Sequence, residues 1–460
     1  MDNVVDFINT HRDRYVEQLR EYLAIPSISA LPEHRADLRR CATWTANEMR
    51  RIGLKKVSLI ETPGHPVVYG EWLEAPNKPT ILFYGHYDVQ PVDPIDLWES
   101  PPFEATVREG EIYARGAADD KGQVFMHLKA VEAHLEQRGL LPLNIKFVLE
   151  GEEEVGSTNL DAFVREHSRD LAADVVVISD SPMFDRGVPS ICYGLRGLAY
   201  FQIDLRGTAT DLHSGSFGGA VSNPAQVLAQ ILAQMRDRSG RVKIPGFYDD
   251  VRPLSEDERT QIKKLPYNET RYRKEIGAPK LFGESGYGTL ERVWARPTFE
   301  INGLLSGFTG VGAKTVIPAV AMAKVSMRLV PDQDPDEIAR AFEAYLRKVA
   351  PKTVELKVTR MHGGKPWMTQ IDNPFMQAAS RAIKKGFGRC PVFTREGGSI
   401  PVVSTFQDVL RLPCVLFGIG LPDENAHAPN ERLDLENFHK GIITSAHLYE
   451  EISSIEASTS

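Results

Sequence analysis

The stretch TILFYGHYDV, residues 80–89, decides the fold because it joins a buried strand to a reactive side chain. Its first half, Thr80–Tyr84, is a continuous apolar run, which is typical of a strand covered on both faces. Runs of the same kind occur at Asn144–Leu149, Asp174–Ile178 and Val415–Ile419. Helix-like segments at about 121–138 and 158–168 separate the first three runs. This alternation predicts an α/β fold with a mainly parallel sheet flanked by helices.

The chain is too long for one ordinary core, since 460 residues exceed the size at which chains divide into domains. Near residue 190 the hydrophobic pattern of the sequence changes. Apolar and polar residues alternate more at 191–206, and residues 240–300 are polar and rich in Pro, Arg and Glu. A strand is predicted at Lys314–Leu329, and helical periodicity occurs at 3–23, 36–52, 222–237, 334–349 and 435–455. We therefore expect a first domain made of residues 1–187 and 365–460, interrupted by an inserted α/β domain at residues 188–364.

The composition restricts the classes of partner. A net charge of -8 and a pI near 5.9 argue against nucleic acid or an anionic membrane, because phosphate binding needs basic patches. No stretch approaches the length of a membrane span, and the N-terminus has no apolar signal region, so a cytoplasmic location is expected. The four cysteines lack CxxC spacing, which predicts free, mostly buried thiols rather than a disulfide framework or a zinc ribbon.

Histidine or acidic side chains follow each of the buried runs. They are His86, the pair Glu153 and Glu154, Asp180 and His427, and Asp119 comes after a glycine turn. In open α/β sheets, ligands bind beyond the carboxyl ends of the strands, so these side chains are expected to converge. Imidazole and carboxylate without thiolate are typical of a catalytic zinc or manganese site rather than a structural one.

The number of these groups fits two metal ions, which need a bridging carboxylate and near-symmetric terminal ligands. One Asp, two His and two terminal carboxylates meet that need. Asp88 is then available to accept the free ring N–H of His86. One carboxylate of the pair Glu153 and Glu154 can bind metal while the other takes a proton. Each feature alone is weak, because acidic runs are usually solvated turns and Asp often caps a helix.

The order of six motifs resembles the M20 family of metallopeptidases across nearly the whole chain. The motifs are GHYDV (85–89), ARGAADDKGQ (114–123), EGEEEVGS (150–157), ISDS (178–181), DLHSG (211–215) and NAHAPNE (425–431). Within the family the chain looks most like the carnosinase and cytosolic non-specific dipeptidase group, with support from GAKTVIP (312–318), VSMRLVP (325–331) and GGSIPVV (397–403). One departure is Gln123, where animal dipeptidases often carry proline, and it leaves the branch within the family open.

The resemblance implies a role for each strand-end residue. Two divalent cations, zinc ahead of manganese or cobalt, would be held by His86, Asp119, Glu154, Asp180 and His427. Asp119 would bridge both cations and form a cis peptide bond with Asp120. His86 and Asp180 would complete one cation site, and Glu154 and His427 the other. Glu153 would be the base that activates a metal-bridging water and later the acid toward the amine, and Asp88 would orient His86.

The resemblance also implies that the inserted domain is a lid and a dimerisation domain, and that the protein is a homodimer. His213 would reach the site of the neighbouring subunit and stabilise the oxyanion, with Thr315 close to the same pocket. Arg328 would bind the C-terminal carboxylate of the substrate, because a guanidinium matches a carboxylate with two donors. Gly398 and Ser399 would contact that same carboxylate.

The leading interpretation is therefore a dinuclear-metal hydrolase that cuts the peptide bond of dipeptides. The alternatives within the family are an N-acyl-amino-acid deacylase or desuccinylase and a carboxypeptidase, which share the metal site. A catalytically dead scaffold is a further alternative, and the full set of ligand types together with Glu153 argues against it. His127 and His134, on the predicted helix at 121–138, are expected to be packing or surface residues.

Overall fold

The computed structural model describes residues 1–398 and 400–456 and shows a mixed α/β fold with two units. The first unit contains Met1–Tyr193, Thr369–Thr394 and Thr405–Ser460. The second unit contains Gly194–Met368 and Arg395–Ser404. The chain therefore leaves the first unit twice before its C-terminal segment completes that unit.

The stretch Arg395–Ser404 belongs to the second unit, although the predicted first domain includes it. Arg196 explains the difference. Its backbone N–H donates to Glu396 O at 3.3 Å, and its Nε donates to Gly397 O at 3.1 Å. Such contacts between distant parts of the chain leave no trace in hydrophobic periodicity. The roles expected for the two domains, catalysis on one side and lid with dimerisation on the other, stay predictions.

A nine-stranded sheet has the order β1-β2-β6-β3-β7-β17-β8-β15, with β16 also paired to β8, and its first six strands lie in the first unit. The strands are β1 (Lys55–Ile60), β2 (Val67–Trp72), β3 (Thr80–His86), β6 (Asn144–Glu150), β7 (Val175–Ile178), β8 (Ser190–Leu195), β15 (Trp367–Met368), β16 (Val392–Glu396) and β17 (Cys414–Leu416). The neighbours β6, β3, β7 and β17 run parallel to one another. The centre of the sheet is therefore parallel, as expected, and the flanking pairs β1–β2, β2–β6 and β17–β8 are antiparallel.

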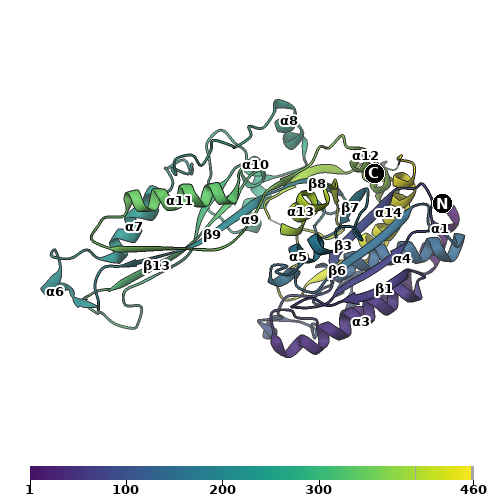
Figure 1. Cartoon of the computed structure of the whole chain (residues 1–460), viewed down its shortest axis with the longest axis horizontal. Helices are drawn as coiled ribbons and strands as arrows, with labels where there is room; N and C mark the ends of the chain where they lie inside the picture. The colour runs from purple at the N-terminus through teal and green to yellow at the C-terminus, as the bar shows by residue number, and fades with distance from the viewer. Residues whose placement is uncertain (399, 457–460) are drawn as a thin grey trace. The chain divides into compact units, whose positions relative to one another are not determined.

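The α-helices of the first unit are α1 (Asp2–Thr10), α2 (Arg12–Leu23), α3 (Arg35–Arg51), α4 (Lys121–Arg138), α5 (Leu160–Glu166), α12 (Pro374–Phe387) and α14 (Leu435–Ser453). Helices α3, α4 and α14 are among those that lie beside this sheet (Figure 1). Helices α4 and α12 pack against α14, and α3 packs on β1 and β2. A small sheet with the order β18-β5-β4 joins β18 (Arg432–Asp434), β5 (Glu111–Tyr113) and β4 (Thr106–Arg108).

Strand β3 lies among the parallel strands, and its contacts explain why its sequence is apolar throughout. The ring of Phe83 lies 4.4 Å from His127 of α4 and 5.8 Å from Tyr449 of α14, measured between centroids. The next residue, Tyr84, has its ring 5.5 Å from that of Phe406. Successive side chains of a strand point to opposite faces, so both faces of β3 are covered.

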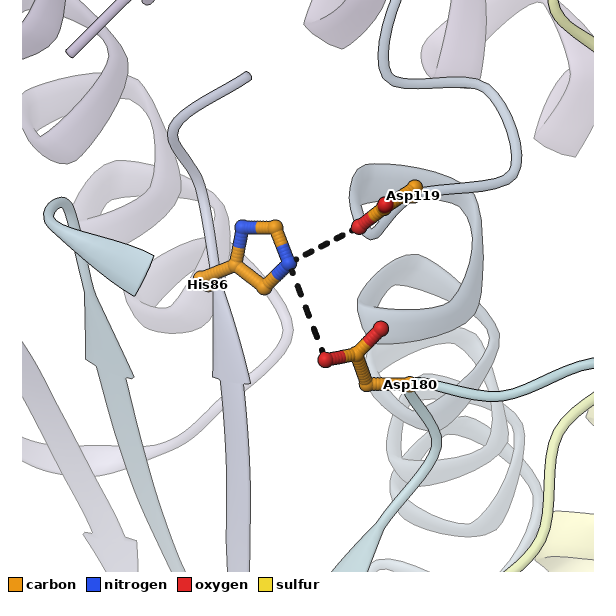
Figure 2. Close-up of side chains that lie close together, drawn as sticks. All are labelled: His86, Asp119 and Asp180. Atoms are coloured by element: carbon orange, nitrogen blue, oxygen red, sulfur yellow. Dashed lines mark hydrogen bonds and ion pairs between the residues drawn. The ribbon is translucent and has the colours of Figure 1, made fainter. Parts of the chain in front are cut away.

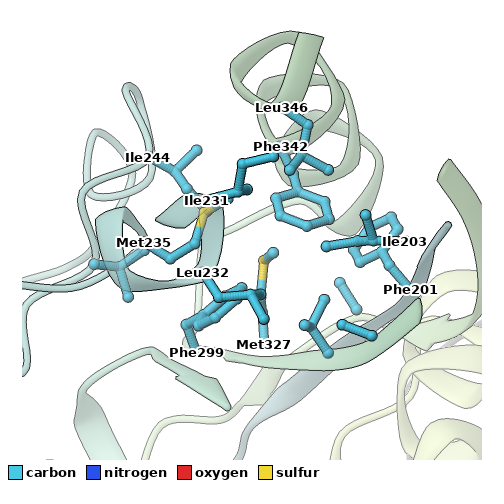
Figure 3. Packing of buried hydrophobic residues seen from close by; sticks show 14 of the residues in the cluster. Phe201, Ile203, Ile231, Leu232, Met235, Ile244, Phe299, Met327, Phe342 and Leu346 are labelled. Atoms are coloured by element: carbon cyan, nitrogen blue, oxygen red, sulfur yellow. The ribbon is translucent and has the colours of Figure 1, made fainter. Parts of the chain in front are cut away.

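The second unit contains a four-stranded antiparallel sheet with the order β11-β13-β9-β14. Its strands are β9 (Gly197–Arg206), β11 (Thr298–Ser306), β13 (Val320–Leu329) and β14 (Glu355–Gly364). Alternate residues of β9 are buried, and helices α7 (Pro224–Gln234) and α11 (Pro335–Val349) pack on the sheet. Figure 3 shows this core, in which Phe342 of α11 lies beside Phe201 and Phe299.

Shorter elements complete the part of the chain that the structure describes. They are β10 (Leu212–His213), β12 (Val316–Ile317), α6 (Ser214–Phe217), α8 (Glu256–Lys264), α9 (Glu269–Glu275), α10 (Thr289–Ala295), α13 (Pro401–Thr405), the 3-10 helices η1 (Pro32–His34), η2 (Ile95–Leu97) and η3 (Glu153–Val155), and a π-helix at Phe406–Leu410. Within the described residues, no helix combines the length and the apolar character that crossing a membrane requires. All four cysteines are free, and only Cys390 is exposed.

Two predicted elements are divided in the structure, and the predicted strand Val415–Ile419 is shortened. The helical stripe at 3–23 forms two helices, because the backbone leaves helical geometry at His11, with φ -112° and ψ 16°. The predicted strand Lys314–Leu329 is divided into β12 and β13, and Pro318, which lacks the N–H that a ladder needs, lies between them. The predicted strand Val415–Ile419 is β17, which ends at Leu416, and the Ile419 N–H donates to the side chain of Gln123 instead of to a strand.

Candidate metal centre

The parallel strands bring the predicted metal ligands to one edge of the sheet. His86 is the last residue of β3, and Asp180 follows β7. Glu153 and Glu154 begin the short 3-10 helix η3 (Glu153–Val155), which follows β6. The carboxyl ends of parallel strands meet at the same edge, so adjacent strands deliver these side chains to one place.

His86, Asp119 and Asp180 form a first ligand group (Figure 2). His86 Nε2 lies 3.0 Å from Asp119 Oδ1 and 4.0 Å from Asp180 Oδ2. The His86 side chain has no exposed surface, and the two carboxylates are mostly buried. The three donor atoms are close enough to bind one metal ion.

Asp119, Glu154 and His427 form a second ligand group. His427 Nε2 lies 2.9 Å from Asp119 Oδ2 and 3.3 Å from Glu154 Oε2. Asp119 therefore uses one carboxylate oxygen toward each histidine, as a residue that bridges two cations must. The Asp119–Asp120 peptide bond is cis, as expected.

The charge of this cluster tests whether the residues suit two divalent cations. Burial raises the pKa of Asp180 to about 7, and the Asp119 carboxylate acts in the same direction. Burial alone would lower the pKa of His86, but its hydrogen bonds to Asp119 and Asp88 raise it well above the usual value. The hydrogen bonds of His427 to Asp119 and Glu154 raise its pKa to about 10. The cluster thus attracts positive charge, and its imidazole and carboxylate donors fit two divalent cations.

Asp88 is fully buried and contacts two parts of the site. The Nδ1 atom of His86 lies 3.1 Å from the backbone oxygen of Asp88 and 3.3 Å from Asp88 Oδ1, which is where an orienting residue is expected. The Asp88 carboxylate also accepts the backbone N–H groups of Glu153 and Glu154, at 3.3 and 3.1 Å. It therefore holds the segment that carries Glu154 as well as the ring of His86.

Glu153 lies beside the ligand groups without belonging to either of them. Burial raises its pKa to about 9, and the carboxylates of Asp180 and Glu154 add to this effect, although His86 opposes it. Because Glu153 belongs to neither ligand group, its carboxyl group is not required as a metal ligand. Of the adjacent pair, Glu154 thus belongs to a group that could hold a metal ion, and Glu153 belongs to neither group.

Two glutamines contact the site in ways that the sequence analysis did not predict. Gln90 Nε2 donates to Glu154 Oε2 at 2.8 Å, and so orients a ligand of the second group. Gln123 donates to Ala118 O and accepts from the Ile419 N–H, both at 2.9 Å. The only sequence signals were the position of Gln90 just after GHYDV and the unusual residue at 123.

A cavity of about 310 Å³ adjoins the ligand groups within the first unit. Its lining includes Asp119 and Asp180 on the metal side and Ser181, Leu421 and Asn425 around it. Small-molecule sites typically begin at about this size. The first unit therefore has space for a small substrate next to the ligands.

The predicted substrate-binding residues lie in the second unit. His213 ends β10 and is exposed, and its Nε2 lies 3.5 Å from Thr315 Oγ1. Arg328 lies on β13 and is half-buried, which lowers the pKa of its guanidinium. Gly398 is exposed, and Ser399 lies outside the described residues.

Comparison with known proteins adds to this geometry. Residues 82–451 match the model of peptidase family M20/M25/M40. The chain belongs to this family. The match contains every residue of both ligand groups, and the order of their motifs is the order in which the sheet brings them together.

Relatives of this M20 peptidase extend over nearly its full length. It is 34% identical over 457 residues to the Cys-Gly metallodipeptidase dug1 of Schizosaccharomyces pombe, with 96% of each chain covered. Its structure is similar to that of human carnosine dipeptidase 1, with a TM-score of 0.84, 34% identity and 99% of each chain covered. It is also similar to the M20 family metallo-carboxypeptidase Sso-CP2 of Sulfolobus solfataricus, with a TM-score of 0.86, 35% identity and coverage of 96% and 99%.

Proposed function

We propose that this M20 peptidase is a zinc-dependent dipeptidase that hydrolyses the peptide bond of unblocked dipeptides. The observation that carries the proposal is the pair of ligand groups that share Asp119, next to the free carboxyl group of Glu153. The dipeptidases among the relatives, named for Cys-Gly and for carnosine, support a substrate of two residues.

The chemistry divides between the cations and the residues of the chain. Two divalent cations would supply Lewis acidity at the scissile carbonyl and an acidified water molecule. Glu153 takes the proton of that water and delivers it to the departing amine. Asp88 holds His86 and the Glu153–Glu154 backbone in place, so that the base keeps a fixed position relative to the ligands.

The residues of the second unit are proposed to bind the substrate. Arg328 binds its C-terminal carboxylate, together with Gly398 and Ser399, and His213 stabilises the oxyanion in the site of a neighbouring subunit. The position of Thr315 next to His213 is consistent with a shared pocket. The same proposal includes a homodimer formed through the second unit, which sedimentation of the purified protein tests. A cytoplasmic location stays a prediction from the sequence.

The substrate class is tested with protein stripped of metal and reloaded with Zn²⁺, Mn²⁺ or Co²⁺. The panel contains free dipeptides, including Cys-Gly and β-Ala-His, N-acetylated and N-succinylated amino acids, and N-blocked dipeptides. Metal-dependent release of amino acids from the free dipeptides alone is expected, with Zn²⁺ as the best activator. Cleavage of only the acylated amino acids would move the protein to the deacylase branch.

A carboxypeptidase is the second candidate, because the Sulfolobus carboxypeptidase matches this chain as well as the dipeptidases do. The two functions differ in the amino group of the substrate. A dipeptidase requires a free α-amine, whereas a carboxypeptidase accepts a blocked or longer chain. Efficient cleavage of the N-blocked dipeptides, at rates equal to those of the free ones, would favour the carboxypeptidase.

The base is tested with the substitution Glu153→Gln. Since general acid–base catalysis contributes about 10²–10⁴-fold, kcat is expected to fall by about that factor while two equivalents of metal remain bound. Glu152→Gln is the matched control, because its carboxylate accepts hydrogen bonds from Asn159 Nδ2, at 2.9 and 3.0 Å, outside both ligand groups. If Glu153→Gln kept the activity of the control, another group would have to be the base.

A further inference from the structure

Glu431 is a fully buried carboxylate at the end of the loop that carries His427. Its Oε2 atom accepts hydrogen bonds from Arg115 Nη1 at 2.7 Å and from the Gly116 N–H at 2.9 Å. Its Oε1 atom accepts from the N–H groups of Ala118 and Asp119, at 3.0 and 3.1 Å. One side chain thus holds the whole segment that ends in the shared ligand.

All four hydrogen-bond partners described for the Glu431 side chain are donors, and this indicates the ionisation state of its carboxyl group. Three backbone N–H groups and one guanidinium point at the two oxygens, which only an ionised carboxylate can satisfy on both sides. Arg115 is buried as well and donates a further hydrogen bond from Nη2 to Pro91 O at 3.0 Å. The carboxylate and the guanidinium therefore neutralise each other where water does not reach.

The segment that Glu431 belongs to is itself fixed at both ends. On one side, His427 and Asn430 have φ angles of 62°, in the left-handed region, which a non-glycine residue keeps only where its surroundings enforce it. On the other side, β18 begins at Arg432 and pairs with β5. Glu431 lies between these parts, so it connects the backbone of Asp119 to the backbone of His427.

We propose that Glu431 is a positioning residue that fixes the shared ligand Asp119, and through it both cation sites, relative to the His427 loop. The inference rests on the proposed two-cation function, but it concerns cation binding and not the choice of substrate. The Glu431 side chain contacts the ligand groups at one described point, the backbone N–H of Asp119. Its loss therefore acts through the geometry of Asp119 and not through the chemistry of hydrolysis.

The substitution Glu431→Gln tests this, because the amide keeps the size of the side chain but can accept on only one side. Calorimetry with Zn²⁺ alone is expected to show both binding events weakened about 10–100-fold, the range typical of residues that support metal ligands. Absorption spectra with Co²⁺ in place of Zn²⁺ should change, since they report ligand geometry. At saturating Zn²⁺ the kcat of Glu431→Gln should recover, in contrast to that of Glu153→Gln.

Glu424→Gln is the matched control for Zn²⁺ affinity. Glu424 is almost fully buried on the same loop, burial raises its pKa to about 8, and its Oε1 accepts from the Asp434 N–H rather than from the Asp119 segment. This control is expected to bind two Zn²⁺ ions with the affinity of the unchanged protein. Equal Zn²⁺ affinity in Glu431→Gln and in the control would overturn the proposal.

A second variant keeps the test decisive if Glu431→Gln does not fold. Glu431→Asp keeps the charge but shortens the side chain, so it cannot reach Arg115 and the Asp119 N–H together. Reduced Zn²⁺ affinity supports the proposal, and unchanged affinity overturns it. The two proposals can fail separately. If no free dipeptide is cleaved but these variants lose Zn²⁺ affinity, the proposed function is rejected and this inference stands.

Discussion

The two ligand groups share Asp119 but are held in different ways. His86 ends a central strand and is fully buried, whereas the His427 side chain is 55% exposed and belongs to a loop. The sheet fixes the first group through its ladder of backbone hydrogen bonds, while the second depends on contacts such as those of Gln90 and Glu431. One dinuclear site can therefore combine a rigid half, the group of His86, with an assembled half, the group of His427, which depends on contacts between distant parts of the chain.

The substitution Asp119→Asn is expected to have the largest effect on metal binding, because Asp119 is the residue that the two ligand groups have in common. A neutral amide cannot offer an anionic oxygen to each cation. Zn²⁺ affinity is expected to fall at both sites by more than the roughly 10–100-fold typical of supporting residues. Calorimetry measures this, with Asp423→Asn as control, since that exposed carboxylate pairs with Arg432 instead. Retention of one site at full affinity would show that the two halves do not share this ligand.

Replacing each histidine by asparagine tests separately how firmly each ligand group is held. His86→Asn and His427→Asn are each expected to lose one of two Zn²⁺ ions, and Asn tolerates the left-handed backbone at 427. His86→Asn should also destabilise the metal-free protein by about 1–3 kcal/mol, and by more than His427→Asn, because it removes hydrogen bonds of a fully buried ring to Asp88 and Asp119 whereas the contacts of His427 are half exposed. Urea denaturation gives the two free energies of unfolding. Equal losses of stability would mean that the strand does not fix its half more firmly than the loop does.

An effect on stability alone, without loss of metal, is expected from His127, which is nearly as buried as His86 but lies outside both groups. Burial lowers the pKa of His127 to about 3, so the folded protein keeps this ring neutral while the unfolded chain binds a proton below about pH 6.5. Stability should therefore fall as the pH drops from 6.5, by about 2 kcal/mol near pH 5. His127→Gln cannot titrate and should lose less stability between pH 7.5 and 5. Parallel profiles for the two proteins would assign the pH dependence to other groups.

The sequence predicted the candidate ligands of both halves, but not the contacts that support the second half. A continuous apolar run followed at once by His86 is a local signal, and it identified both a strand and the side chain at its end. The supporting contacts are of another kind. Gln90, Gln123 and Glu431 act on residues that are distant along the chain, so no local pattern shows them.

The fold shows the same division between local and distant information. Helix α4 has the predicted bounds. The helix predicted at 3–23 and the strand predicted at 314–329 are each divided into two elements. Helices α8 and α9, within the polar stretch at 240–300, went unpredicted because they have few apolar residues. Their caps, Ser255 and Asn268, accept backbone N–H groups in the structure and were the available signal.

The position of β17 in the sheet has a consequence for synthesis of the chain. This strand lies between β7 and β8, yet both of those strands leave the ribosome long before Cys414 does. Until then the nascent sheet has an open edge at Val175–Ile178, and contacts between such distant segments form slowly. His427 and Glu431 emerge later still, so the second ligand group cannot form before residue 427 has been synthesised. A product truncated before β17 would expose an apolar edge at β7 and contain a complete set of residues for the first ligand group alone.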